Sequence, residues 1–424
     1  MGSSSFASYV IQLPLLLFFL VSFSNAANDL PSFSNIIFNL DRDPLTLQYR
    51  ININQGTPLA TVKLVLDFSG KLSGLYCNKG AYTSSSYQPI KCLSPQCSLA
   101  SKPVTCVSCN GTNPKNTWCH KNGCSISTRN PVTRFSGKGE LISDVVYTES
   151  IYAFRNEGYI RGPIDLRPIS FGCATNSNFL KGLGEGAKGV AGLGRSSRLS
   201  LVSQFSAAFP QFCRAFALDL SGLLIYFGGG PYIYSYGTFF GDLSKLFHYT
   251  PLLANPKSIE EYFIDVKSVK IHGKTVPIDK KLLSINKTTG VGGTKIDILK
   301  PYTVLETSIY KAFIKVHTKW AKGMNVSRVT TVAPFGACYK PSTIPPWTSK
   351  PGSVAFIFPK SEWRIVWRDL VSVNNDGVRC LGFVDGGLKP KTSIVIGAHQ
   401  LGWFMEFDTS KSRWGFLQPE SGQQ

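Results

Sequence analysis

Two aspartates, each placed directly after a short strand-like stretch, are the residues of this chain best suited to chemistry. Asp67 follows the apolar run 64–66, and Asp297 follows the stretch 293–296 far along the chain. Two carboxylates held a few ångströms apart can share one proton and activate water, because like charges that close cannot both ionise. The pattern predicts a β-rich protein of two lobes, each supplying one carboxylate, although both aspartates could instead be ordinary turn residues.

The residues around the two aspartates resemble the pepsin-like aspartic proteinases, whose signature is Asp-Thr/Ser-Gly once per lobe. The resemblance implies that the hydroxyl braces the turn and that the glycine lets the backbone turn tightly. Here Phe68-Ser69 follow Asp67, and Ile298-Leu299 follow Asp297. We therefore predict a vestigial, inactive dyad. If Lys300 reached Asp297, it would favour ionisation of that carboxylate over proton sharing.

Further family features are present in part. The stretch 189–195 resembles the glycine-rich turn beneath the first aspartate, and 393–400 resembles its counterpart in the second lobe. A phosphate-binding loop at 189–195 is disfavoured because the Lys-Ser/Thr pair of that motif is absent. The family's flap tyrosine is expected near Val132, but no Tyr occurs between 125 and 146.

Four longer motifs resemble the non-catalytic plant branch of this peptidase A1 family, which contains xylanase inhibitors, xyloglucan-endoglucanase inhibitors of the extracellular dermal glycoprotein type and basic seed globulins. They are 55–59, 292–296, 301–310 and 380–387. The resemblance implies a mostly β, bilobal pepsin-like fold with a few short helices, and lobes at 27–218 and 219–424. It also implies a non-proteolytic protein that binds and inhibits a xylanase or xyloglucan endoglucanase. The tail cysteine typical of the family is missing.

The N-terminus predicts the compartment. Residues 9–23 are almost wholly apolar and are followed by small residues, so we expect a signal peptide at 1–26 and a secreted, extracellular or cell-wall protein. No stretch predicts a membrane span. Three glycosylation sequons, at Asn110, Asn286 and Asn325, agree with secretion.

Eleven cysteines in a secreted chain predict disulfides, and the odd number leaves one unpaired. The sequence does not fix their connectivity. Zinc binding by Cys106, Cys109, Cys119 and Cys124 is the alternative that secretion disfavours. The candidates for pairing are Cys77, Cys92, Cys97, Cys106, Cys109, Cys119, Cys124, Cys173, Cys338 and Cys380, and Cys213 is the candidate free thiol.

The charge is strongly basic, with 45 Lys and Arg against 25 Asp and Glu and a net charge of +20. This is typical of attraction to anionic partners, and secretion favours a glycoside hydrolase or acidic wall polysaccharide over nucleic acid. A solvated basic surface with no dedicated partner fits the charge equally well. We expect no cofactor and no metal site. With 5 His, no nucleophile–His pattern stands out. The stretch 305–320 has helical periodicity, and His317 on it is predicted to lie at the surface.

Two other functions remain open at this stage. Because both Asp67 and Asp297 are present, the chain could be an active aspartic-type endopeptidase. Alternatively, its basic charge suits a storage or peptide-binding globulin.

Overall fold

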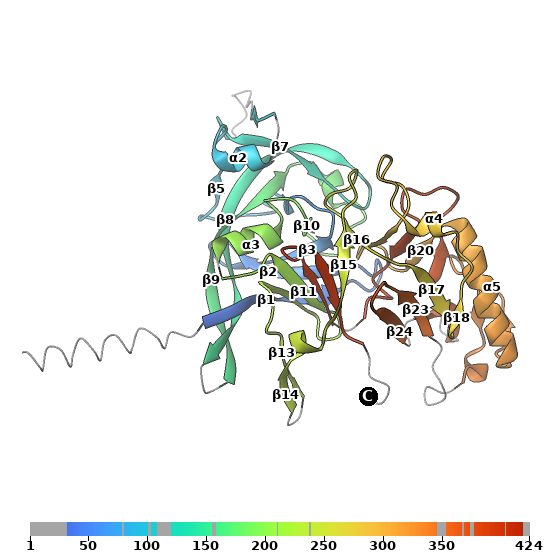
Figure 1. The fold of residues 1–424 in the computed structure, drawn as a ribbon. Helices are drawn as coiled ribbons and strands as arrows, with labels where there is room; N and C mark the ends of the chain where they lie inside the picture. The colour runs from blue at the N-terminus through green and yellow to red at the C-terminus, as the bar shows by residue number, and fades with distance from the viewer. Residues whose placement is uncertain are drawn as a thin grey trace, which may run out of the picture.

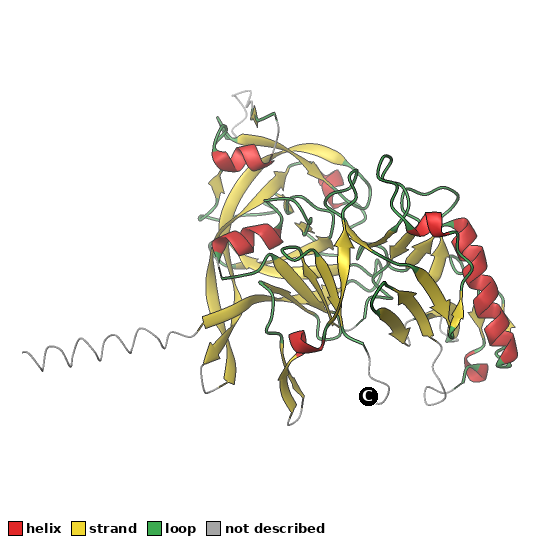
Figure 2. Cartoon of the chain, viewed as in Figure 1, coloured by secondary structure: helices red, strands yellow, loops and turns green. Residues whose placement is uncertain are grey.

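The computed structural model describes residues 32–78, 80–100, 103–107, 120–154, 158–209, 211–236, 239–345, 353–366, 369–373, 377–402 and 404–418. The predicted signal peptide, Cys109, Cys119 and Asn110 lie outside these residues. The chain forms two bodies side by side, with the first half of the sequence in one and most of the second half in the other (Figure 1). Strands dominate both bodies, and the helices lie at their periphery (Figure 2).

Most strands of the first half belong to one hydrogen-bonded network that also contains strands of the second half. The first-half members are β1 (Ser32–Arg42), β2 (Tyr49–Gln55), β3 (Ala60–Asp67), β4 (Gly74–Tyr76), β5 (Gln88–Pro89), β6 (Thr105–Cys106), β7 (Cys124–Arg129), β8 (Ser136–Phe154), β9 (Gly158–Ala174), β10 (Gly189–Gly192), β11 (Ala215–Asp219) and β12 (Leu224–Phe227).

The second-half members join this network through β29, which pairs with β11, and β15 then connects β30 to β16. They are β15 (His248–Leu253), β16 (Tyr262–Ile264), β19 (Thr294–Ile296), β20 (Thr303–Leu305), β27 (Phe383–Asp385), β28 (Ile394–Ile396), β29 (Phe404–Asp408) and β30 (Arg413–Phe416).

Three smaller sheets complete the strands of the described residues. They are formed by β13 (Ile233–Tyr236) with β14 (Phe239–Asp242); by β18 (Lys274–Thr275), β17 (Ser268–Ile271), β23 (Ser353–Ile357) and β24 (Glu362–Val366); and by β21 (Arg328–Val329), β22 (Cys338–Tyr339), β26 (Val378–Leu381) and β25 (Leu370–Val373).

The helices of the described residues are short except for one. They are α2 (Pro95–Ala100), α3 (Leu201–Ala208), α4 (Lys280–Leu283) and α5 (Thr307–Gly323), with 3-10 turns at η1 (Ser177–Leu180), η2 (Leu243–Leu246) and η3 (Pro341–Thr343). Among these residues, no helix is both long and apolar enough to cross a membrane.

Helix α5 confirms the helical periodicity predicted for 305–320. Glu306 caps it by accepting hydrogen bonds from the backbone N–H groups of Ser308 and Ile309. The prediction that His317 lies at the surface is wrong, because its side chain is only 1% exposed. The residues that α5 buries include Ile309, Phe313 and His317, which recur every four positions and so share one face of the helix.

One apolar cluster runs through both halves of the molecule. Strand β11 contributes to it and pairs with β12 on one side and with β29, from the end of the chain, on the other. The boundary expected between residues 218 and 219 falls within β11. We therefore propose that the chain passes between lobes through a shared sheet rather than through a flexible linker.

Four disulfides are present in the described residues: Cys77–Cys173, Cys92–Cys106, Cys97–Cys124 and Cys338–Cys380. Cys97–Cys124 joins α2 to β7, Cys92–Cys106 lies within the cysteine-rich region, and Cys77–Cys173 joins the residue after β4 to β9. Cys213 is exposed and forms no disulfide. These pairings could not be read from spacing, because each joins segments that only the fold brings together.

Candidate functional site

Asp67 is the last residue of β3, and the apolar residues before it are buried in the core. The aspartate itself is 6% exposed. Ser69 donates two hydrogen bonds to Oδ1 of Asp67, from its backbone N–H at 2.9 Å and from its hydroxyl at 2.8 Å. A hydroxyl therefore does brace this carboxylate, but from one position later than in the pepsin-like signature.

The predicted glycine-rich turn beneath Asp67 is confirmed. Strand β10 runs parallel to β3 and places Gly192 opposite Asp67. The backbone N–H groups of Gly70 and Leu193 both donate to the carbonyl of Asp67, at 3.1 and 2.9 Å. A Cβ atom on Gly70 would lie 2.7 Å from Cα of Gly192, so this close approach of two backbones requires glycine.

Phe68 occupies the position at which the signature has its hydroxyl, and its side chain enters the core. It is 2% exposed. Its ring packs edge-on against the rings of Phe216, Tyr262 and Phe407, with centroids 5.6, 5.7 and 5.0 Å away. These rings come from β11, β16 and β29, so Phe68 helps to hold the two halves together rather than support a catalytic turn.

Asp297 lies in a turn built like that of Asp67. It follows β19, which runs parallel to β28, and its backbone N–H donates to the carbonyl of Ile396 at 3.0 Å. The N–H of Leu299 donates to Oδ1 of Asp297 at 3.1 Å, and the N–H of Lys300 donates to its carbonyl at 3.1 Å. The backbone bonds match those of Ser69 and Gly70, but the second turn has no hydroxyl.

The cation beside Asp297 is Lys295. Its Nζ lies 3.6 Å from Oδ2 of Asp297 and also forms an ion pair with Glu261. The side chains of Lys295 and Asp297 are 16% and 19% exposed, so water screens this pair only in part. Lys300, which the sequence suggested for this role, is exposed and contributes its backbone to the turn.

The two carboxylates differ in their electrostatic surroundings. Burial raises the pKa of Asp67, and the negative charge of Asp297 raises it further, against the hydrogen bonds from Ser69 and the charge of Arg129. The structure thus brings the two predicted aspartates within electrostatic range. Burial works to lower the pKa of Lys295, but Asp297 and Glu261 outweigh it and leave that pKa raised.

This asymmetry opposes proton sharing. A dyad of the proteolytic kind passes one proton between equivalent carboxylates. Here Lys295 pairs with Asp297 but not with Asp67, and burial favours the protonated form of Asp67, so the two carboxylates are not equivalent.

The hairpin expected to carry the flap joins β7 to β8 through the turn 130–135. The side chain of Asn130 holds this turn by accepting from the N–H groups of Val132 and Thr133, at 2.8 and 3.0 Å. Val132 is 42% exposed. Arg129, at the end of β7, is close enough to affect the pKa of Asp67. Sequence reasoning missed Arg129, because only the pairing of β7 with β8 directs it toward the first turn.

Two predicted glycosylation residues lie at the surface of the second half. Asn286 and Asn325 are both exposed, and the side chain of Asn286 accepts hydrogen bonds from the N–H groups of Thr288 and Thr289. Their glycosylation remains a proposal.

Comparison with known proteins assigns the family. Models described as xylanase inhibitor N-terminal and xylanase inhibitor C-terminal match residues 49–229 and 261–418. The chain belongs to the xylanase-inhibitor family.

The chain is similar over most of its length to two named relatives and to one solved structure. The chain is 40% identical to "Probable aspartic proteinase GIP2" of Nicotiana benthamiana, over 98% of this chain and 95% of that protein. It is 35% identical to "Gamma conglutin 1" of Prunus dulcis, over 90% and 86%. The structure described as "Crystal structure of edgp" superposes with a TM-score of 0.81 at 38% identity, covering 92% of this chain and 96% of that one. The bilobal pepsin-like fold is thereby confirmed.

Proposed function

We propose that this member of the xylanase-inhibitor family is a secreted, non-proteolytic protein that binds and inhibits a cell-wall-degrading glycoside hydrolase, such as a xylanase or xyloglucan endoglucanase. The observation that carries the non-proteolytic part is the ion pair between Lys295 and Asp297. Its effect is reinforced by Phe68, which fills the hydroxyl position with a core aromatic ring.

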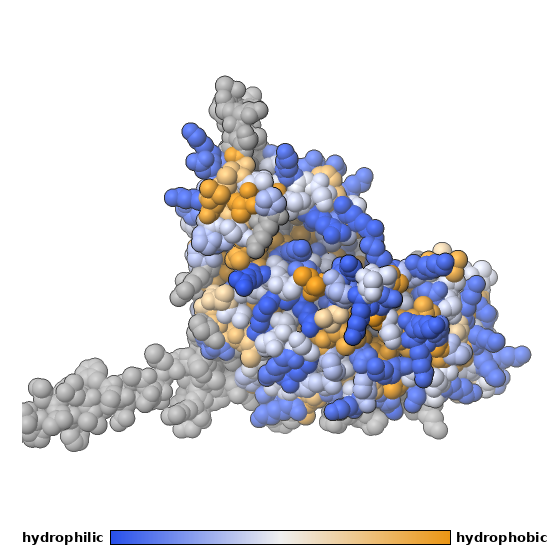
Figure 3. Space-filling view, turned by 45° about the horizontal axis from the view of Figure 1, so that its top comes forward, coloured by the Kyte–Doolittle hydropathy of each residue, from blue (hydrophilic) through white to orange (hydrophobic). Residues whose placement is uncertain are grey.

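The family models and the surface chemistry support the inhibitory part. A glycosidase cleft is lined with carboxylates, and a chain of net charge +20 is attracted to such a cleft. The face shown in Figure 3 is largely hydrophilic, with apolar residues scattered among polar ones. We expect Arg, Lys and aromatic side chains of surface loops to occupy the target's cleft.

Secretion is part of the same proposal. The predicted signal peptide, the four disulfides of the described residues and the exposed Asn286 and Asn325 support it. Acidic wall polysaccharide is a second anionic partner consistent with the basic charge.

Two assays test the proposal. In the first, the purified protein is incubated with a denatured protein substrate across acidic pH, with and without pepstatin, beside Asp67→Asn. We expect no cleavage in any sample. In the second, secreted xylanases and xyloglucan endoglucanases are titrated with the protein, and we expect stoichiometric loss of at least one hydrolase activity.

An active endopeptidase is the second candidate, favoured by the influence of the Asp297 charge on the pKa of Asp67 and by the Ser69 hydroxyl. Pepstatin-sensitive cleavage that disappears in Asp67→Asn would establish this candidate and overturn the non-proteolytic reading. Absence of both cleavage and hydrolase inhibition would leave the storage or peptide-binding globulin as the remaining function.

A further inference from the structure

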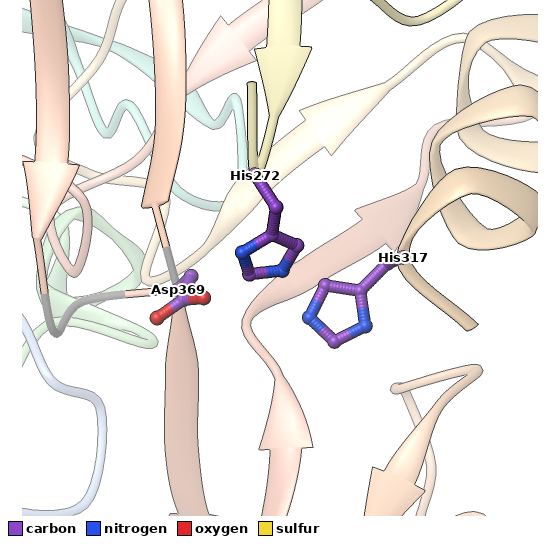
Figure 4. A group of neighbouring side chains, drawn as sticks. All are labelled: His272, His317 and Asp369. Carbon is purple, nitrogen blue, oxygen red and sulfur yellow. The ribbon is translucent and has the colours of Figure 1, made fainter. Parts of the chain in front are cut away.

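A group of three potential metal ligands lies in the second half of the chain, apart from the two aspartates. His272 follows β17 in the turn before β18, His317 lies on α5, and Asp369 immediately precedes β25. Figure 4 shows the three side chains converging from these separate elements, with the His272 ring between the other two. One candidate ligand atom from each residue lies within 4.8 Å of the others.

His317 is the strongest indication of a ligand. Its Nδ1 lies 2.8 Å from the hydroxyl of Tyr339 on β22, whereas its Nε2 is buried and has no hydrogen-bond partner. The side chain is 1% exposed. Figure 4 shows one ring nitrogen directed toward His272. A buried polar nitrogen without a partner is costly, which calls for an explanation such as a bound ion.

The chemistry of the three side chains indicates the class of ion. Asp369 is 5% exposed and supplies a negative charge once a cation is present. Hard Ca²⁺ and Mg²⁺ prefer oxygen ligands, whereas two imidazoles and a carboxylate suit Zn²⁺ and related ions.

We propose that His272, His317 and Asp369 bind one divalent transition-metal ion of the zinc type. Bond lengths near 2 Å and tetrahedral geometry require ligand atoms about 3.3 Å apart, so small side-chain rotations must draw the group inward. Water would fill the fourth position, because the described residues offer three ligands here.

Neighbouring side chains orient the ligands. Trp320 stacks on the His272 ring with centroids 3.5 Å apart and planes 14° apart. The hydroxyl of Tyr339 can accept the Nδ1 hydrogen of His317, which presents Nε2 to the metal, as outer-shell partners of metal-bound histidines do. Tyr339 is itself fixed by Cys338, which is disulfide-bonded to Cys380.

The ion would tie α5 to two sheets of the second half, and it does not depend on the proposed inhibitory function. It would stabilise the folded chain by mass action rather than perform catalysis. No short sequence motif predicts it, because the three ligands are widely separated in the chain.

The test uses the purified full chain carrying Cys213→Ser, so that the exposed thiol cannot bind metal. The protein is stripped with a chelator and titrated with Zn²⁺ by calorimetry and with Co²⁺ by absorption spectroscopy. We expect one ion per chain, a tetrahedral Co²⁺ spectrum and a higher melting temperature with Zn²⁺.

Matched variants locate the ion. His317→Gln and Asp369→Asn keep side-chain size, and each should weaken Zn²⁺ binding by more than about tenfold, while Tyr339→Phe should weaken it about 10- to 100-fold. The exposed His248→Gln is the control and should bind like the parent. If a buried variant fails to fold, the half-buried His272→Ala provides the same test. The proposal would be overturned if the parent did not bind one Zn²⁺ per chain. It would also be overturned if a folded variant of His272, His317 or Asp369 bound Zn²⁺ as tightly as the parent.

Discussion

At the scale of single residues, Phe68 shows how far the first turn departs from a proteolytic one. Its ring is enclosed by Phe216, Tyr262 and Phe407. We expect Phe68→Thr, which restores the hydroxyl of the signature, to destabilise the protein by about 3–5 kcal/mol through loss of buried aromatic surface. Urea denaturation measures this. A loss below about 1 kcal/mol would show that the aromatic cluster does not depend on this ring.

Asp67 predicts a pH dependence of stability. Its pKa in the folded chain is raised above the ordinary value of 3.8, mainly by burial. The unfolded chain therefore releases this proton at lower pH, and the free energy of unfolding contributed by Asp67 falls as pH rises from 3.8 toward the folded pKa. Asp67→Asn should remove that fall in stability, because asparagine has no titratable proton. Its amide oxygen can still accept the hydrogen bonds from Ser69, so the turn should be preserved.

The measurement is the unfolding free energy of parent and Asp67→Asn across the acidic to neutral range. The variant should gain stability relative to the parent as pH rises. The exposed Asp279→Asn serves as control. A difference that stays constant with pH, or shrinks as pH rises, would contradict the raised pKa.

The ion pair between Lys295 and Asp297 was only partly predictable from the sequence. Alternate residues of a strand share one face, so the i, i+2 spacing of Lys295 and Asp297 is a signal that could have indicated this pair. The prediction from the sequence was Lys300, which lies closer to the turn. The contribution of Glu261 could not be foreseen, because the pairing of β16 with β19 brings it to Lys295.

At the scale of elements, the glycine-rich turn is expected to tolerate no side chain. A Cβ atom on Gly192 would lie 2.7–2.8 Å from backbone atoms of Leu72 and Gly70. We expect Gly192→Ala to cost about 1–3 kcal/mol from this overpacking.

Gly323, at the end of α5, is the matched control. A Cβ atom there has no neighbour within 4 Å. Gly323→Ala should be stabilising by about 0.5–1 kcal/mol, since alanine lowers the entropy of the unfolded chain and favours the helix. Equal losses in the two variants, measured by urea denaturation, would show that the turn is not specially crowded.

Helix α5 was predictable in position but not in orientation. The apolar repeat at 305–320 located it, and the buried face then proved to include His317, four residues after Phe313. A polar residue in register with an apolar stripe is the signal that could have indicated burial. Its partners were unpredictable, because Tyr339 and His272 come from other sheets.

At the scale of the whole molecule, the basic charge predicts salt-sensitive association with an acidic target. Between low salt and about 0.5 M NaCl the Debye length falls to about 4 Å, so long-range attraction is screened. We expect the association rate with an inhibited hydrolase to fall by about tenfold, with a smaller change in dissociation. Surface plasmon resonance at several salt concentrations measures both rates. A salt-independent association rate would exclude electrostatic steering.

The overall fold was predicted through resemblance rather than from periodicity. Apolar runs located strands such as β3, but the parallel contacts of β3 with β10 and of β19 with β28 join segments far apart in sequence. Local patterns contain no information about such pairings.

The pairing of β11 with β29 has a consequence for biogenesis. β11 can pair with β29 only after almost the entire second half of the chain has been synthesised. Similarly, β1 can pair with β12 only after the residues between them have been synthesised. Pairing between strands so far apart in sequence makes folding slow, because the entropy cost of closing a long loop comes before the stabilising contacts form. The edge of β11 that pairs with β29, and the side of the Phe216 ring that stacks on Phe407, therefore stay uncovered until the end of synthesis. The chain should depend on chaperones until its last strands emerge, and truncation before β29 should yield aggregates rather than a smaller folded protein.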